Sequence, residues 1–358
     1  MENGLTKEHS KMMQGIAVIM MLYFHLFKTD FPEHISVLNI MCNGLEIKIA
    51  CIGRICTAIF AMVSGYGMTK SCQSVSKDNI KIYFEKAYKK VFKHLYGFYK
   101  MYWLVFIIFI PFRFVITDKG FHIVEFLSNL IGYTYEYNPS WWYVHQYVVM
   151  MLLFPVVNYI LFNVMLTNNI MTAISCIFGI VILAIPVIRD LILQLYEINC
   201  ISYMVVFVFA MLIARYDGFI VFNNVLKKVH LNNMIFSVVM LVAICVFRVI
   251  VTGSDIIAHQ WDFILTPLFT YCIIMIFKGN RSKAILNFFG KHSMYIWLTH
   301  TFYYLVYFKK LFELLRFSFL MYTVLMAVSV MTSIILMYIY NGISRIGTER
   351  KSICQRLK

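Results

Sequence analysis

The first residues that could carry chemistry are a histidine and a glutamine in the first apolar stretch. Residues 11–27 read KMMQGIAVIMMLYFHLF, in which His25 is an ionisable group among apolar side chains. A neutral imidazole accepts or donates a proton near neutral pH, and an ionisable residue inside a membrane segment is a candidate for function. Gln14 precedes His25 by about three helical turns, which predicts that both lie on one helix face roughly 16 Å apart. The alternative for His25 is an interfacial histidine solvated by lipid headgroups.

A second candidate histidine closes a late apolar segment. His300 ends the stretch FFGKHSMYIWLTH, and Ser293 precedes it by about two helical turns on the same expected face. A lone histidine in a packed helix is more often a structural hydrogen-bond donor, and this interpretation stands beside the functional one. For His145 the interfacial interpretation is the stronger.

Four lysines share a stretch that we expect on the inner side of a membrane. They are Lys86, Lys89, Lys90 and Lys93, interleaved with aromatic residues in KDNIKIYFEKAYKKVFKHLYGFY. Membrane topology and attraction to anionic lipid explain such lysines without any further ligand. Binding of a multiply charged anion is the functional alternative.

Aromatic residues gather where another apolar stretch begins. Trp141, Trp142 and Tyr143 stand where an aromatic belt at the membrane surface is expected, and this is the first interpretation. Stacking of a sugar on Trp142 and Tyr143 is the second. Arg113 and Arg248 fall near the expected outer ends of their helices, where a side chain that snorkels to the interface explains them. Arg248 also lies deep enough in its apolar stretch to invite a partner.

Membrane helices must position all of these residues. The chain has 358 residues, of which 61% are hydrophobic and 14% charged, and its mean hydropathy is +0.74. A membrane span needs roughly 20 apolar residues, and backbone groups in lipid must pair within their own helix. We therefore predict an all-α, polytopic bundle of about ten transmembrane helices. They are expected near residues 12–27, 49–69, 95–116, 141–162, 170–188, 200–214, 232–252, 261–277, 292–308 and 318–340.

The distribution of basic residues predicts the orientation. With both termini in the cytoplasm, most of the 32 lysines and arginines fall on the inner side. This topology explains most of the net charge of +15, so anionic membrane lipid is the expected partner and nucleic acid is not. We expect one integral membrane domain over residues 1–358, with no cleaved signal peptide and no appended soluble domain. The nine cysteines show no CxxC spacing and indicate no metal site.

Four stretches, in this order, resemble motifs of the membrane acyltransferase 3 family. QGIAVIMMLYFH is similar to a first helix in which a basic residue precedes Gly-Ile-Ala and a histidine follows at the far end. FAMVSGYGMTKS contains Ser64 and Gly65 and resembles the Ser-Gly signature of the second helix. SWWYVHQYVVMMLLFPVV resembles a tryptophan-led helix with a later proline, here Pro155. FFGKHSMYIWLTH resembles the late helix that closes on a histidine, here His300.

The resemblance implies a membrane O-acyltransferase, most often an O-acetyltransferase. Its donor would be cytoplasmic acetyl-CoA or another acyl-CoA, with no permanently bound cofactor, and its acceptor a hydroxyl of a cell-surface or secreted polysaccharide or of a lipid-linked precursor. His25 is then the expected base or transient acyl carrier, with His300 as a second catalytic candidate. Gln14 and the four lysines are the expected donor-binding residues, because acetyl-CoA carries several phosphate charges. Trp142 and Tyr143 are the candidates for binding the acceptor.

Two departures from the family pattern accompany this resemblance. The family usually has arginine or lysine where this chain has Gln14, and Lys11 is the nearest basic residue, almost one turn earlier. The basic stretch before the third helix is usually arginine-rich and ends in proline, whereas here it contains lysines and no proline. The alternative function is a transporter or flippase of a polar or lipid-linked solute. The sequence has neither an inverted repeat nor paired Gly/Pro-broken helices, which favours the enzyme. In either case we expect a multi-pass protein of the plasma membrane.

Overall fold

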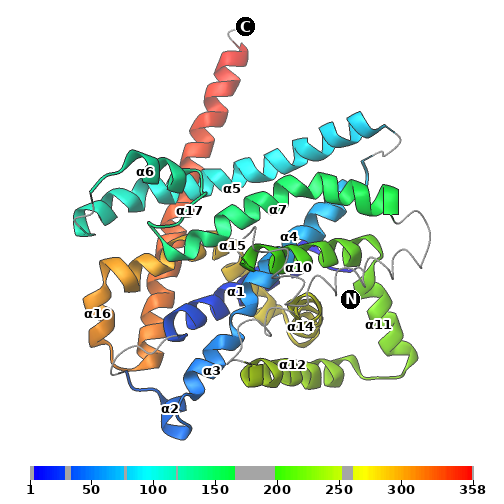
Figure 1. Ribbon diagram of the computed structural model, residues 1–358, viewed down its shortest axis with the longest axis horizontal. Helices are drawn as coiled ribbons and strands as arrows, with labels where there is room; N and C mark the ends of the chain where they lie inside the picture. The colour runs from blue at the N-terminus through cyan, green and yellow to red at the C-terminus, as the bar shows by residue number, and fades with distance from the viewer. Residues whose placement is uncertain are drawn as a thin grey trace. The chain divides into compact units, whose positions relative to one another are not determined.

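A computed structural model of the chain describes residues 4–28, 34–75, 79–117, 120–165, 198–251 and 261–356. Within these ranges the regular secondary structure is helical, with one isolated bridge between Ile35 and Phe317. The α-helices are α1 (Lys7–Phe27), α2 (Val37–Met41), α3 (Leu45–Ile52), α4 (Ile55–Cys72), α5 (Ile80–Thr117), α6 (Ile123–Leu130), α7 (Trp142–Tyr159), α10 (Ile198–Arg215), α11 (Gly218–Lys228), α12 (Asn233–Ile250), α14 (Asp262–Ile276), α15 (Asn280–Phe302), α16 (Lys309–Leu314) and α17 (Ser318–Arg356) (Figure 1). The all-α prediction is confirmed for the described residues.

Among the residues that the structure describes, six helical segments are long and apolar enough to cross a membrane, or up to seven if the bent pair α10–α11 counts as one. They are 7–27, 45–72, 80–117, 139–162, 233–250 and 318–345, which correspond to six of the ten expected spans. The bent pair corresponds to the expected span 200–214. The expected span 170–188 lies outside the described residues.

The two remaining expected spans form helices that do not meet the criteria of length and composition. α14 has only 15 residues, which at 1.5 Å per residue is shorter than a hydrocarbon core of about 30 Å. α15 begins at Asn280, well before the expected start at 292, and its first half carries Arg281, Lys283 and Lys291. The count of ten and the cytoplasmic termini therefore stay predictions.

The lysine stretch that we expected as an inner loop is instead part of a continuous helix. α5 runs for 38 residues from Ile80 to Thr117, a length of about 57 Å at 1.5 Å per residue. This length exceeds the hydrocarbon thickness, so the helix continues beyond the apolar stretch that we expected to span the membrane. The loop prediction was wrong because lysine, glutamate, alanine and leucine are all strong helix formers, and no proline separates the two halves.

The described helices form two compact units. The first comprises residues 1–29, 38–94 and 146–291, and the second residues 30–37, 95–145 and 292–358. In the first unit α4 packs along α10 and against α1, while α12 packs on α14 (Figure 1). The single integral membrane domain that the sequence led us to expect stays a prediction.

Two glycine contacts allow helices of the first unit to approach each other closely. A Cβ atom at Gly15 of α1 would meet the Leu286 carbonyl of α15, and one at Gly290 of α15 would meet the Lys11 carbonyl of α1. A Cβ atom at Gly65 of α4 would meet the Phe207 carbonyl of α10. These glycines come from three of the four motifs, and their shared property is that backbone packs directly on backbone.

A matched pair of substitutions in α4 tests this role. We expect Gly65→Ala to destabilise the protein by about 1–3 kcal/mol, since the added methyl group has only rigid backbone to push against. Gly67→Ala, two residues later, should instead stabilise it by about 0.5–1 kcal/mol, because nothing lies within 4 Å of that Cβ position and alanine favours helix. The measurement is thermal unfolding of both purified variants. Equal effects at the two positions would contradict the close approach.

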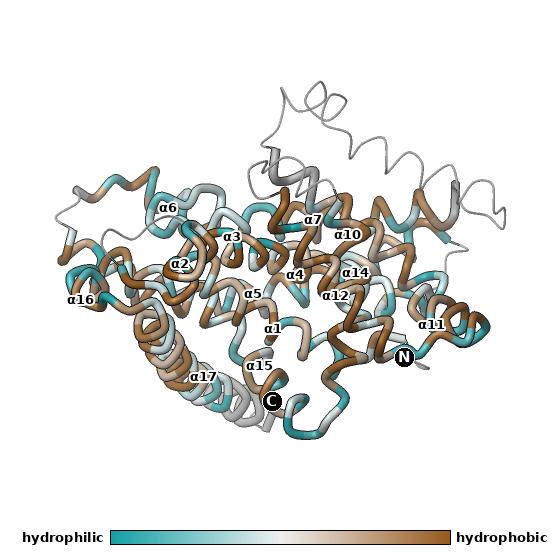
Figure 2. Tube along the Cα trace, turned by 90° about the horizontal axis from the view of Figure 1, so that it is seen from below, coloured by the Kyte–Doolittle hydropathy of each residue, from teal (hydrophilic) through white to brown (hydrophobic). Residues whose placement is uncertain are grey.

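The outer faces of two helices are suited to lipid. Figure 2 shows apolar residues along α12 and α17, and many of these side chains are exposed, including Val239, Val242, Ile250, Phe319 and Tyr338. Only Ser237, Ile244 and Arg248 of α12 are buried. Exposed apolar area of this extent on a helical protein is typical of a surface that faces hydrocarbon chains.

Candidate active site

α1 carries His25 and Gln14 on a helix with a defined start. The hydroxyl of Thr6 accepts a hydrogen bond from the His9 amide at 3.1 Å, and the Thr6 amide donates to Nδ1 of His9 at 3.4 Å. This reciprocal cap satisfies two amides of the first turn. Gln14 and His25 are both half-buried, which agrees with one shared, partly covered face.

His25 occupies the last turn of α1. Its ring centroid lies 5.3 Å from that of Phe24, so one side of the imidazole has an apolar neighbour. A half-buried histidine in this position has the properties that a proton acceptor needs.

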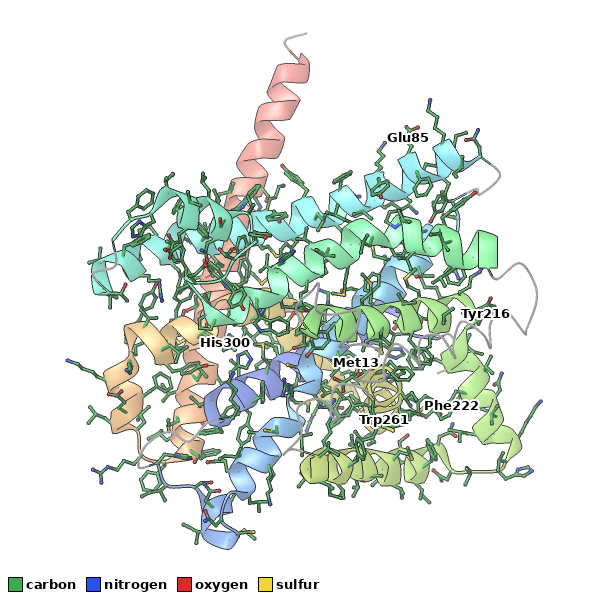
Figure 3. The ribbon with its side chains drawn as sticks, viewed as in Figure 1. Met13, Glu85, Tyr216, Phe222, Trp261 and His300 are labelled. Atoms are coloured by element: carbon green, nitrogen blue, oxygen red, sulfur yellow. The ribbon has the colours of Figure 1, made fainter. Side chains whose placement is uncertain are left out.

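The lysines of α5 lie on the side of the helix opposite its buried side. Tyr83, Ala87 and Val91 follow one another at a spacing of one turn and are fully buried. Lys86, Lys89 and Lys93 are exposed, and the labelled Glu85 points outward from the same half of α5 (Figure 3). We call Lys86, Lys89 and Lys93 the lysine face.

Two contacts within the first unit hold this half of α5 in place. The Tyr83 hydroxyl donates to the Pro155 carbonyl of α7 at 3.2 Å and accepts from Nδ2 of Asn158 at 2.6 Å. The Lys90 ammonium donates to the carbonyl of Ser71, in the last turn of α4. A cation at a helix C-terminus satisfies an orphan carbonyl and the helix dipole. Lys90 thus has a structural contact that the lysine face lacks.

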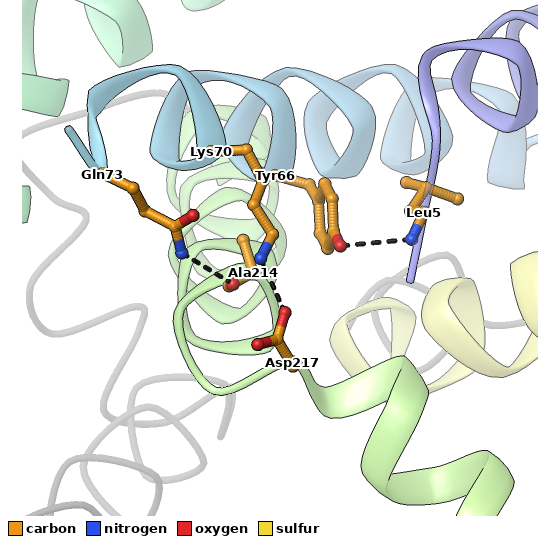
Figure 4. Close-up of polar contacts among 6 residues, drawn as sticks. All are labelled: Leu5, Tyr66, Lys70, Gln73, Ala214 and Asp217. Carbon is orange, nitrogen blue, oxygen red and sulfur yellow. Dashed lines mark hydrogen bonds and ion pairs between the residues drawn. The ribbon is translucent and has the colours of Figure 1, made fainter. Parts of the chain in front are cut away.

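The end of the second motif also joins segments far apart in the sequence (Figure 4). The Tyr66 hydroxyl accepts from the Leu5 amide at 3.2 Å, and Lys70 pairs with Asp217 at 2.6 Å. Asp217 has a φ of 51° and joins α10 to α11, which meet at a bend of 68°. Aspartate is one of the few residues with a side chain that adopt this left-handed conformation readily.

His300 is a fully buried residue of the second unit (Figure 3). Its Nδ1 atom lies 2.8 Å from the Trp297 carbonyl and 3.2 Å from the Ile296 carbonyl. Because a carbonyl only accepts, Nδ1 carries the proton and Nε2 is the basic nitrogen of the neutral ring. Both the structural and the catalytic interpretation of His300 are compatible with this tautomer. Ser293 is buried as well.

The turn before α7 is anchored on the last part of α15. Nε1 of Trp141 donates to the Leu298 carbonyl at 3.0 Å, and Nε1 of Trp297 donates to the Ser140 carbonyl at 3.1 Å. Asn138 Oδ1 accepts from the Thr301 hydroxyl at 2.7 Å. Trp141 is fully buried, so its interpretation as a belt residue was wrong: both the ring and its N–H are used inside the protein.

The two expected acceptor-binding residues follow this turn. Tyr143 is 6% exposed, and its ring centroid lies 5.8 Å from that of Trp297. Trp142 is half-buried and its ring centroid lies 5.7 Å from that of Tyr143. Packing against α15 occupies much of Tyr143, so Trp142 is the more accessible of the two.

The first unit contains a buried ion pair whose acidic residue the sequence analysis did not identify. Arg248, in the last turn of α12, pairs with Asp262, in the first turn of α14. Their side chains are 2% and 1% exposed, so Arg248 does not snorkel to the interface. Each charge lies at the helix end whose dipole favours it. The one available signal was the depth of Arg248 in an apolar segment, because such a residue needs a partner.

The described geometry is that of a helical membrane protein with polar groups on otherwise apolar helices. The model of an acyltransferase domain family, the acyltransferase 3 family, matches residues 11–338. The chain belongs to this family. Comparison of the acyltransferase with curated proteins gave no match. Comparison with solved structures gave none either.

Family membership decides between the two functions considered. The protein is a multi-pass membrane acyltransferase, which favours the enzyme over the transporter or flippase. The match begins at Lys11 and ends at Tyr338, so the acyltransferase domain includes most of α1, all of α5 and α15, and the first half of α17.

Proposed function

We propose that this acyltransferase is an O-acetyltransferase of the plasma membrane. It would take the acetyl group from cytoplasmic acetyl-CoA and pass it to a hydroxyl of a cell-surface or secreted polysaccharide, or of its lipid-linked precursor. One observation carries the proposal: the first unit combines the exposed lysine face with the half-buried His25. The phosphates of acetyl-CoA would bind the lysines, and His25 would serve the transfer step.

The catalytic and donor-binding candidates have the following roles in this proposal. His25 would accept the proton of the acceptor hydroxyl as it attacks the acetyl carbonyl, or would carry the acetyl group transiently. His300 is the alternative base, since its Nε2 nitrogen is the basic one. Gln14, half-buried on α1, would donate hydrogen bonds to the donor. Lys90 would contribute to donor binding less than the lysine face, because it already holds α4.

The direct test uses purified protein in lipid nanodiscs with acetyl-CoA. The acceptor is surface polysaccharide from the source cells, freed of its esters by mild alkali. We expect release of free coenzyme A and new acetyl esters on the glycan. Consumption of another acyl-CoA but not of acetyl-CoA would correct the donor, and no ester on any glycan fraction would overturn the proposal.

Charge reversal on the lysine face should weaken donor binding. We expect Lys89→Glu combined with Lys93→Glu to raise the Kd for acetyl-CoA about five- to thirtyfold at low ionic strength. The effect should shrink strongly near 1 M salt, where the Debye length is only about 3 Å. Isothermal titration at two salt concentrations provides the measurement.

A matched control places the same charge change elsewhere. Lys310→Glu combined with Arg316→Glu also reverses two exposed basic residues. They lie between the expected ninth and tenth spans, 292–308 and 318–340, a loop that the topology with both termini in the cytoplasm predicts outside the cell. We expect donor affinity to be unchanged in this variant. A similar loss of acetyl-CoA affinity in both double variants would show that net charge causes the effect, and would contradict binding of acetyl-CoA to the lysine face.

A further inference from the structure

The residues between α6 and the turn at Pro139 form a loop with exposed rings on a fixed backbone. We call residues 131–138, which read IGYTYEYN, the tyrosine loop. Tyr133 is 63% exposed and Tyr135 is 40% exposed, whereas Tyr137 is 1% exposed. The side chains thus alternate, and two of the three rings point outward. The loop and its supports all belong to the second unit.

A buried asparagine organises the tyrosine loop. Nδ2 of Asn129, a fully buried residue, donates to the Thr134 hydroxyl at 3.1 Å and to a carboxylate oxygen of Glu136 at 2.7 Å. Its Oδ1 atom accepts from the Tyr137 amide at 3.2 Å. Gly132, with a φ of 75°, reverses the chain at the end of α6. One amide side chain therefore fixes three positions of the loop.

The second half of α5 holds the same loop from the other side. The Tyr99 hydroxyl donates to the Ile131 carbonyl at 2.8 Å, and Nε1 of Trp103 donates to the Leu130 carbonyl at 3.0 Å. Nη2 of Arg113 donates to the Glu136 carbonyl at 3.4 Å. Three side chains of one helix thus satisfy carbonyl groups in the loop and at the end of α6, which leaves little conformational entropy to lose on binding.

Glu136 adds a polar group to the exposed rings. Its side chain is exposed at the surface, and the bond from Asn129 fixes one of its carboxylate oxygens. The ring of His145 lies beside Tyr133, with 5.2 Å between centroids. Flat rings next to an oriented carboxylate match the chemistry of a sugar, because the C–H face of a sugar stacks on aromatic rings and its hydroxyls donate to carboxylates. A belt residue needs neither a fixed backbone nor a carboxylate.

We propose that the tyrosine loop is the acceptor subsite, in which Tyr133 and Tyr135 stack on a sugar ring and Glu136 accepts hydrogen bonds from its hydroxyls. This inference rests on the proposed function and names its acceptor as an uncharged sugar ring, because Glu136 would repel an acidic one. The far end of the loop is fixed to α15 beside His300: Asn138 Nδ2 donates to the Leu298 carbonyl at 3.3 Å, and Asn138 Oδ1 accepts from Thr301.

The experiment measures the KM for the de-esterified surface polysaccharide and the KM for acetyl-CoA in nanodiscs. The test variant combines Tyr133→Leu and Tyr135→Leu, which remove the rings but keep apolar bulk suited to a membrane surface. We expect the glycan KM to rise about tenfold or more, with the acetyl-CoA KM unchanged. The matching variant with Tyr133→Phe and Tyr135→Phe keeps the rings and should stay within about threefold of the wild type.

Two further variants separate a sugar site from a membrane belt. Tyr338→Leu removes an exposed ring from the lipid-facing α17 and should leave both KM values unchanged. Glu136→Gln keeps an oxygen for Asn129 but removes the charge, and should raise the glycan KM alone. An unchanged glycan KM in the leucine variant would overturn the inference, and so would loss of its thermal transition, since the rings would then serve packing. No transfer by the wild type would instead contradict the proposed function.

Discussion

Replacing His25 with alanine should lower the rate of acetyl transfer about 10²–10⁴-fold, the usual contribution of a positioned general base. A transient acyl carrier at this position would give a loss at least as large, because the covalent route itself would disappear. The half-buried side chain lies in the last turn of α1, where truncation removes few packing contacts. The thermal transition should therefore stay close to that of the wild type. The measurement is turnover of acetyl-CoA with glycan present, alongside thermal unfolding.

The control for this prediction is His122→Ala. His122 is exposed and precedes α6 in an extended conformation, so alanine fits its backbone and no catalytic role is expected. Free imidazole should restore part of the activity of the His25 variant, because it can replace the missing side chain. It should not restore activity to a variant that is misfolded. If the His25 variant transfers acetyl groups at nearly the wild-type rate, His300 becomes the candidate base. Loss of transfer in His300→Ala would then support that assignment.

Replacing Asp262 with alanine should destabilise the acyltransferase by about 3–5 kcal/mol, because Arg248 would remain buried without its counter-ion. The burial of both side chains makes this the largest stability effect that we expect from a single substitution. Asp262→Asn should cost less, since the amide oxygen still accepts a hydrogen bond. Unfolding of the purified variants by heat or denaturant provides the measurement.

A double variant separates the loss of the pair from the loss of the residues. Arg248→Met combined with Asp262→Leu replaces the ion pair with apolar side chains and should recover most of the stability of the single variant. A double variant as unstable as Asp262→Ala would show that the two charges do not act on each other. If the double variant is active, the ion pair contributes to stability alone and is not needed for acyl transfer.

Much of the helical framework could be predicted from the sequence because long apolar runs leave a membrane chain few choices. The spans that begin near Asn233 and Ser318 begin where an apolar run starts. The predicted helix ends were wrong where the composition of the sequence does not change sharply. α5 continues through the lysine stretch because its residues favour helix whether or not lipid surrounds them, and hydropathy marks only the lipid-facing part.

The sequence could predict which residues belong to the candidate site, but not which residues contact each other. His25, Gln14 and the lysine face were visible as polar groups in or beside apolar runs. The contact of Gly15 with α15, the pair of Arg248 and Asp262, and the bonds of Asn129 depend on tertiary packing between segments that a single sequence does not bring together. The alternation of Tyr133, Tyr135 and Tyr137 in a polar loop was the signal for the tyrosine loop. Its meaning depends on Asn129, whose burial the sequence does not show.

α12 has a consequence for how the enzyme must be handled. Few side chains of α12 are buried in the protein, so we expect the surrounding lipid chains to hold this helix in position. A small micelle that admits water beside Arg248 and Asp262 would screen their attraction, which is strong only in a medium of low dielectric constant. The lipid molecules around α12 therefore contribute to the stability of the enzyme. Its activity should be measured in patches of native bilayer.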